Sequence, residues 1–325
     1  MDFLTASLGL VILLVAGDSL VRGAVNLSLR LGVPALIVAL TIVAFGTSAP
    51  ELLISIDAVL TDVPGLALGN VIGSNTANVL LVLGVPALLK GLDTSGCDTR
   101  KDYIQMMMAT VLFMALAATG GVFGFWQGVA LLAALGLVLS GTFRIALAHR
   151  RQNAGAGAAL AECDVPIEEE IEGADPDMPW WKVILFLAIG MIGLPLGADL
   201  LVDAATNIAH AYNVPDEVIG LTLVALGTSL PELATTVMAA FRNQADVALG
   251  NVIGSNLFNL LAIIGVASLV GPIPVDPKLL RIDMWVMLIS SLILAPFVFR
   301  HWRIGRLWGA GFFLLYLVYI VSVVA

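Results

Sequence analysis

Charged side chains are scarce in this sequence. Only 12% of its 325 residues are Asp, Glu, Lys or Arg, whereas 59% are hydrophobic and the mean hydropathy is +1.01. An average soluble domain has about 25% charged residues. The composition therefore excludes an ordinary soluble domain and indicates a polytopic helical membrane protein, whose first partner is the lipid bilayer.

Cysteines and basic tracts are also few. The two cysteines, Cys97 and Cys163, give no metal-binding spacing and no disulfide framework. No run of Lys and Arg is long enough to bind a phosphate backbone, so nucleic acid is not expected as a partner. The N-terminus lacks the basic region and cleavage site of a signal peptide, and we expect its apolar run to remain as a first membrane helix.

Long apolar runs are abundant, and they predict an all-α polytopic protein with ten transmembrane helices. The predicted spans are 3–30, 33–60, 65–89, 103–119, 122–147, 181–211, 215–241, 246–270, 283–299 and 303–324. Several exceed the roughly 20 residues that cross a bilayer, so tilted or interrupted helices are expected.

One polar segment divides the chain into a first half (1–147), a linker (148–180) and a second half (181–325). The linker is rich in Gly, Ala and acidic residues, which is typical of a flexible connection. Calcium sensing by its acids is an alternative. If the N-terminus lies outside the cell, only Lys278 and Arg281 among the Lys and Arg residues are clearly external, while Arg22 lies within the first helix. The positive-inside rule then predicts a cytoplasmic linker and external termini in the cytoplasmic (inner) membrane.

A short motif with a buried acid occurs once in each half. The copies are Gly46-Thr-Ser-Ala-Pro-Glu51 and Gly227-Thr-Ser-Leu-Pro-Glu232. A carboxylate within an apolar run costs at least about 2.5 kcal/mol, so its default interpretation is functional. The proline before each Glu removes a helical hydrogen bond and predicts a broken helix. Free carbonyls and hydroxyls beside a carboxylate are oxygen ligands that suit calcium and sodium.

The halves align without a gap at an offset of 181 residues, which carries Glu51 onto Glu232 and Asn78 onto Asn259. The run Gly69-Asn-Val-Ile-Gly-Ser-Asn75 recurs letter for letter at 250–256. Because each half has an odd number of predicted helices, the copies would cross the membrane in opposite directions. We therefore predict two inverted five-helix repeats with a site at the membrane midplane.

A polar stripe follows each copy of the motif. Asn70, Ser74 and Asn78 are four residues apart and share one helix face, and Asn251, Ser255 and Asn259 repeat the pattern. Packing is the alternative explanation, but the stripes stand beside the Glu motifs. We interpret them as further lining of the ion site.

These paired motifs resemble the α-repeats of the sodium/calcium exchangers, within the cation/Ca2+ antiporter superfamily, and most of all its compact prokaryotic members. The resemblance implies a central core made by the second, third, seventh and eighth helices, with the first and sixth sliding across it. It implies metal ligands from both halves, and no cofactor beyond the transported Ca2+ and Na+. Carried over by motif position, these ligands are the carboxylates of Glu51 and Glu232, the carbonyls of Thr47, Thr228, Ala44 and Ala225, the side chains of Ser48, Ser229, Ser74 and Ser255, and the central Asn78 and Asn259.

One position departs from that pattern. Well-described members often have Asp where this chain has Asn259, so the pocket holds two carboxylates here. Its charge of −2 is neutralised by one Ca2+ or by two monovalent cations, and an empty charged site resists crossing. We predict a secondary antiporter that exchanges Ca2+ for Na+ by alternating access, not an enzyme. A Ca2+/H+ antiporter is the main alternative, with K+ open as a further coupling ion. A channel and an intramembrane acid protease are weaker alternatives.

Overall fold

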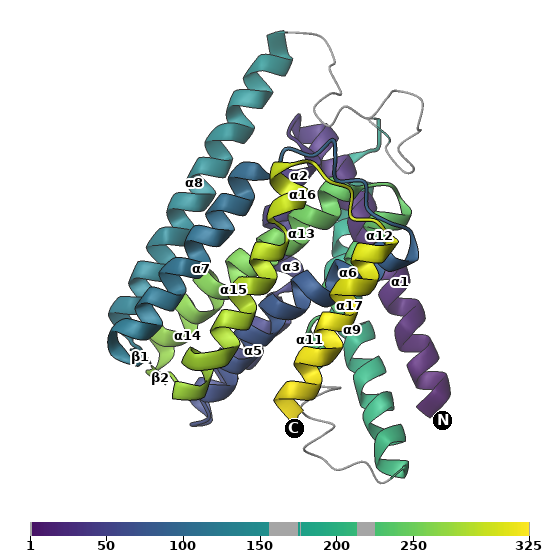
Figure 1. Ribbon diagram of the computed structural model, residues 1–325. Coiled ribbons are helices and arrows are strands. Elements are labelled where there is room, and N and C mark those ends of the chain that lie inside the picture. Colours follow the sequence, from purple (N-terminus) through teal and green to yellow (C-terminus); the bar gives the residue numbers. More distant parts are fainter. Residues whose placement is uncertain (1, 156–174, 176, 213–224, 325) are drawn as a thin grey trace.

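The computed structural model describes residues 2–155, 175, 177–212 and 225–324 (Figure 1). Most of the predicted linker, including Cys163, lies outside these residues. The helix before it continues to Gly155 instead of ending near 147. Residues 148–154 contain neither glycine nor proline, so the sequence offers nothing to stop the helix earlier.

The first half is helical apart from one short strand, β1 (Val122–Phe123). Its helices are α1 (Asp2–Leu31), α2 (Ala35–Val38), η1 (Ala39–Val43), α3 (Ala44–Thr47), α4 (Ala49–Leu60), α5 (Gly65–Ala77), η2 (Asn78–Val82), α6 (Gly84–Leu89), α7 (Arg100–Gly120) and α8 (Phe125–Gly155). The η segments are π-helical turns inserted in longer helices, which are frequent at functional sites.

The second half is also helical apart from β2 (Ile273–Pro274). Its helices are α9 (Trp180–Ala211), α11 (Ala225–Thr228), α12 (Leu230–Phe241), α13 (Ala245–Phe258), η4 (Asn259–Ile263), α14 (Ile264–Val270), η5 (Leu279–Asp283), α15 (Met284–Ile293), α16 (Ala295–Phe299) and α17 (Arg306–Val324). β2 pairs antiparallel with β1, in the register Val122↔Pro274 and Phe123↔Ile273, and so ties the two halves together at one end of the molecule.

Seven helices in the described residues are long and apolar enough to span a membrane. The pair 35–47 and 49–60, bent by 43° at its break, makes an eighth if it is one span. Two shorter apolar helices, Leu230–Phe241 and Arg306–Ser322, accompany them. The prediction of a mostly helical polytopic membrane protein is confirmed.

The sequence repeat is also a repeat of local structure. A shift of 181 residues carries α4 onto α12 and η2 onto η4 without any change of bounds, and it carries the end of α3 onto the end of α11. Asp62 and Asn243, which follow α4 and α12, both have positive φ, at 60° and 55°. The same residue pattern therefore produces the same breaks and turns twice.

The middle of the molecule is formed by the third helix of each half. The apolar window of Gly65–Leu89 is 83% buried and that of Ala245–Val270 is 89% buried, against 17% for α8 at the periphery. Figure 1 shows α7 and α8 forming one outer side, with α1 on the opposite side. α1 packs on α9 at close range, since a Cβ on Gly190 would lie 2.5 Å from Cβ of Leu20. Glycine is required there for the helices to approach.

Candidate ion-binding site

Both motifs break their helices at the serine before the proline. Ser48 lies between α3 and α4 with φ −86° and ψ 5°, and Ser229 lies between α11 and α12 with φ −90° and ψ 2°. The helix resumes at once, because the Ser48 carbonyl accepts from the Leu52 N–H at 3.2 Å and the Ser229 carbonyl from Leu233 at 3.0 Å. Each break places its Glu in the first turn of a new helix, where the helix dipole favours negative charge.

The two glutamates are buried and lie close to each other. Glu51 and Glu232 are each 1% exposed, and the Glu232 carboxylate lies 3.3 Å from the hydroxyl of Ser48, three residues before Glu51. Neither belongs to an ion pair in the described part of the chain. Acids that are buried without a basic partner are costly, and a bound cation removes that cost.

Side chains from both halves surround Glu232. Ser48 Oγ donates to Glu232 Oε1 at 3.3 Å, and the hydroxyls of Thr47 and Ser255 also lie against this carboxylate. Thr47 Oγ1 lies 3.5 Å from Ser255 Oγ, and Asn251 Nδ2 donates to the Glu232 carbonyl at 3.4 Å. The structure therefore brings together several of the ligands that the sequence assigned to one site.

Four buried oxygens at the centre have no hydrogen-bond partner among the described residues. They form two repeat-related pairs, Oε2 of Glu51 and Glu232 and Oδ1 of Asn78 and Asn259. Buried polar atoms are nearly always partnered, so such exceptions need an explanation. Four oxygen acceptors with a charge of −2 are the donor set of a hard cation such as Ca2+ or Na+.

The other predicted ligands lie in the same breaks and helices. Thr228 ends α11, Ser74 is buried in α5, and Ser229 Oγ has no partner among the described residues. Ala225 lies in α11. The Ala44 carbonyl already accepts from the Ser48 N–H at 3.0 Å and from Thr47 Oγ1 at 3.2 Å. An ion at that carbonyl would have to replace the Thr47 hydroxyl.

Two asparagines next to the site were not predicted as site residues. Asn256 Oδ1 accepts from Asn78 Nδ2 at 3.0 Å, and Asn75 Oδ1 accepts from Asn259 Nδ2 at 3.0 Å. They are the last residues of the two identical heptapeptides, and that identity was the signal in the sequence. Among the described residues there is no cluster of three or more His, Cys, Asp or Glu side chains, so amides and hydroxyls complete the donor set.

Comparison with known proteins agrees with this geometry. The family model described as sodium/calcium exchanger protein matches residues 2–144 and 182–325. The chain belongs to this family. It is therefore an integral membrane ion exchanger rather than an enzyme, and no cofactor is implied.

Relatives are similar over almost the whole chain. The sodium/calcium exchanger MaX1 of Methanosarcina acetivorans is 32% identical, over 98% of this chain and 97% of its own. The putative antiporter CaxA of Alkalimonas amylolytica is 33% identical, over 92% and 90%. A solved structure of the sodium-calcium exchanger NCX_Mj, soaked with Na+ and Sr2+, superposes with a TM-score of 0.77 at 33% identity and covers 98% of this chain and 97% of that one.

Proposed function

We propose that this family member exchanges Ca2+ for Na+ by alternating access at a site between Glu51 and Glu232. The observation that carries the proposal is the set of four buried oxygens on Glu51, Glu232, Asn78 and Asn259 that have no partner in the described part of the chain. A positive ion suits them, because the described neighbours supply hydroxyls and amides but form no ion pair with the glutamates. The name of the Methanosarcina relative supports Na+ as the counter-ion.

The charge of the site explains why exchange is obligatory. Two ionised carboxylates give −2, which one Ca2+ or two Na+ neutralise. Moving an uncompensated charge through the low-dielectric core of a membrane is costly, so the loaded forms cross and the empty form does not. In sodium loading, we propose that Ser48, Ser229, Ser74 and Ser255 add hydroxyl ligands, while the Thr47 and Thr228 carbonyls serve calcium.

We further propose that the halves are inverted repeats of five transmembrane helices each. The equal bounds of α4 and α12 and of η2 and η4, together with the matching ends of α3 and α11, support a structural repeat. In such transporters the site lies where broken helices of the two repeats meet. A rocking motion of one set of helices against the other would then open the site to each side in turn.

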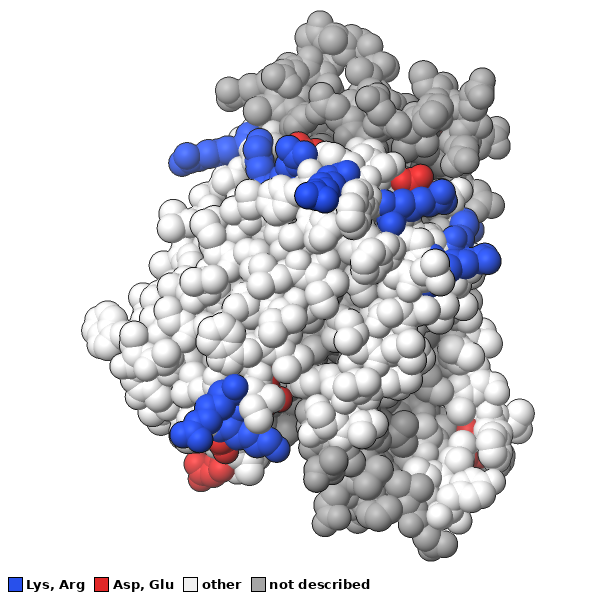
Figure 2. Space-filling model, viewed as in Figure 1, with Lys and Arg blue, Asp and Glu red and all other residues white. Residues whose placement is uncertain are grey.

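For orientation we propose external termini and a cytoplasmic linker. Figure 2 shows a large group of Lys and Arg side chains at one end of the molecule and a smaller group at the other. Arg100 Nη2 donates to the Phe299 carbonyl, and Lys90 Nζ donates to the Phe241 carbonyl. Basic side chains of the first half therefore bind helix ends of the second half. The positive-inside rule makes the larger group cytoplasmic.

Thiol labelling tests this orientation. In a chain with Cys97 and Cys163 replaced by Ser, Lys278→Cys should react with an impermeant reagent applied to intact cells. Arg300→Cys should react only after the cells are opened. Both positions are exposed, so access depends on the side of the membrane. External labelling of Arg300→Cys alone would reverse the orientation.

Flux into proteoliposomes tests the counter-ion. We expect an outward Na+ gradient to drive Ca2+ uptake, with Glu51→Gln as the inactive control. Uptake driven by an outward H+ gradient, and indifferent to Na+, would replace the proposal with the Ca2+/H+ antiporter. A requirement for K+ would add a second monovalent ion. Ca2+ uptake that does not depend on a gradient of any counter-ion would indicate a channel.

A further inference from the structure

We propose that Asn75 and Asn256 are positioning residues, which turn the amide oxygens of Asn78 and Asn259 toward the cation. An amide side chain has one accepting end and one donating end, and only the oxygen suits a cation. This inference rests on the proposed function, because it concerns how the same site is kept ready for a positive ion.

Hydrogen bonds from Asn256 fix the direction of the Asn78 amide. Asn256 Nδ2 donates to the backbone carbonyl of Asn75 at 3.4 Å, and a backbone carbonyl can only accept. Asn256 must therefore present its oxygen to Asn78, which answers with Nδ2 at 3.0 Å. The oxygen of Asn78 is the end left over, and it is buried without a partner.

The repeat-related hydrogen bonds from Asn75 fix the direction of the Asn259 amide. Asn75 Nδ2 donates to the backbone carbonyl of Asn256 at 3.4 Å, so Asn75 Oδ1 faces Asn259. Asn259 donates Nδ2 to it at 3.0 Å and is left with a partnerless Oδ1. Reversing any one of the four amides would bring two donors or two acceptors together, so the backbone determines the polarity of the whole network.

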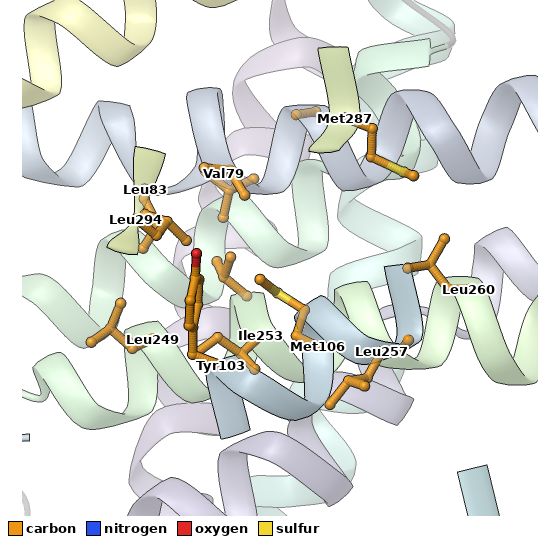
Figure 3. Close-up of a cluster of buried hydrophobic side chains, with 14 of the residues drawn as sticks. Val79, Leu83, Tyr103, Met106, Leu249, Ile253, Leu257, Leu260, Met287 and Leu294 are labelled. Atoms are coloured by element: carbon orange, nitrogen blue, oxygen red, sulfur yellow. The ribbon is translucent and has the colours of Figure 1, made fainter. Parts of the chain in front are cut away.

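The neighbours keep competing partners away. Asn75 and Asn256 are each 1% exposed. Their Nδ2 atoms face the sulfur atoms of Met287 and Met106, which belong to the buried hydrophobic cluster drawn in Figure 3. Sulfur is a weak acceptor. The amides therefore depend on one another for their strong hydrogen bonds.

The oriented oxygens lie on helical segments that pack against the helices of the two glutamates. η2, which begins at Asn78, packs on α12 with Glu232, and η4, which begins at Asn259, packs on α4 with Glu51. Without Asn256, the Asn78 N–H groups would lose their acceptor and turn toward the carboxylates. A donor would then occupy the place of the cation, and Ca2+ would have to displace it.

The test is the KM for Ca2+ of Na+-driven uptake by the full chain in proteoliposomes. We expect Asn256→Ala to raise this KM roughly tenfold or more, which is the scale of one hydrogen bond to a charged group. Two controls should keep the parental KM. Asn207→Ala changes an exposed asparagine of α9, and Ile253→Ala removes buried volume beside the network without removing a hydrogen bond. A lowered Tm with an unchanged KM in Asn256→Ala would overturn the inference.

A double-mutant comparison separates orientation from general damage. Once Asn78→Ala has removed the amide that Asn256 orients, adding Asn256→Ala should change the KM no further. In an Asn259→Ala background, Asn256→Ala should keep its full effect, because Asn259 is oriented by Asn75. The same fold-change in both backgrounds would contradict the positioning role.

Glu51→Gln and Glu232→Gln, assayed in the same vesicles, distinguish the two levels of failure. If either glutamine variant transports like the parent, the proposed site itself is wrong. If both are inactive and Asn256→Ala has the parental KM, the site stands and only the positioning role is lost.

Discussion

The two halves have the same motifs, yet the surroundings of their glutamates differ. Near Glu232, the Ser48 hydroxyl donates to the carboxylate, and Asn251 donates to Thr236 at 3.2 Å. Their repeat-related counterparts, which belong with Glu51, are Ser229 Oγ, Asn70 Nδ2 and Ser55 Oγ, and these buried atoms have no partner among the described residues. We call the surroundings of each glutamate a half-site. The half-site of Glu232 is closed by hydrogen bonds, and the half-site of Glu51 is open.

This difference is what we expect if the halves are inverted repeats, as proposed above. Related sequences with identical local geometry have similar intrinsic stability in either arrangement, so a small shift in packing can exchange the closed and open roles. We interpret the structure as one of two states and expect the open half-site to close in the other. The difference between the half-sites can be tested with substitutions in both halves.

Substituting either glutamate should cause the largest loss of Ca2+ exchange, and the two losses should be equal. Glu51→Gln and Glu232→Gln each remove one negative charge from a site with only two carboxylates, and we expect Ca2+ exchange to fall to background in both. Uptake into vesicles and a thermal melt of the purified protein would be measured together. If one variant were active and the other inactive, the two half-sites would not be functionally equivalent.

A third acid at the centre should change the pH dependence. We expect Asn259→Asp to retain Ca2+ exchange but to depend more steeply on pH than the parent, because three close carboxylates do not all ionise easily. Asn78→Asp is the matched variant in the other half and should behave alike. Exchange would be followed over a pH series, and parental profiles in both variants would place the two asparagines outside the ion site.

Substituting the serines at the helix breaks should have smaller effects, one on Na+ activation and one on stability. If Ser48 and Ser229 exchange roles during transport, Ser48→Ala and Ser229→Ala should weaken Na+ activation by similar factors. Only Ser48→Ala removes a hydrogen bond in the present state, at an expected cost of about 1.5–3 kcal/mol for a charged acceptor. Chemical denaturation measures that difference, and equal stabilities would remove Ser48 from the closed half-site.

The smallest expected effect lies outside the site, where α1 meets the end of α12. Asp18 pairs with Arg22 at 3.0 Å and with Arg242 at 2.5 Å, whereas its repeat counterpart, Asp199, is exposed. We expect Arg242→Gln to lower stability by about 1–3 kcal/mol, since it breaks a partly buried charged hydrogen bond. Asp199→Asn should leave the Tm unchanged. Equal melting temperatures for Arg242→Gln and the parent would show that the pair contributes nothing.

The helix breaks could be predicted from the sequence, because Pro50 and Pro231 lack the N–H group that would continue the helix. The repeat could be predicted from the alignment of the two halves. Most helices were also predicted within a few residues. The π-helical turns that begin at Asn78 and Asn259 were not predicted. The strands β1 and β2 were missed because two residues are too few for an alternating pattern. α17 begins at Arg306 and η5 at Leu279, a few residues from the predicted 303 and 283.

Within the site, the residue types were predictable but their pairings were not. Glu51 and Glu232 were evident because acids are rare in apolar runs. The bond from Ser48 to Glu232 joins residues 184 positions apart, and no local pattern encodes which half-site is closed. The roles of Asn75 and Asn256 depend on backbone carbonyls of the opposite half, so they required the fold.

Equilibrium binding of radioactive Ca2+ to the purified full chain is the strictest test of a shared two-glutamate site. We predict one Ca2+ per chain, displaced by Na+ with a Hill coefficient above one, since more than one Na+ replaces each Ca2+. The Glu51→Gln, Glu232→Gln double variant should bind none. Ca2+ binding that persists in the double variant, or that ignores Na+, would contradict a shared two-glutamate site.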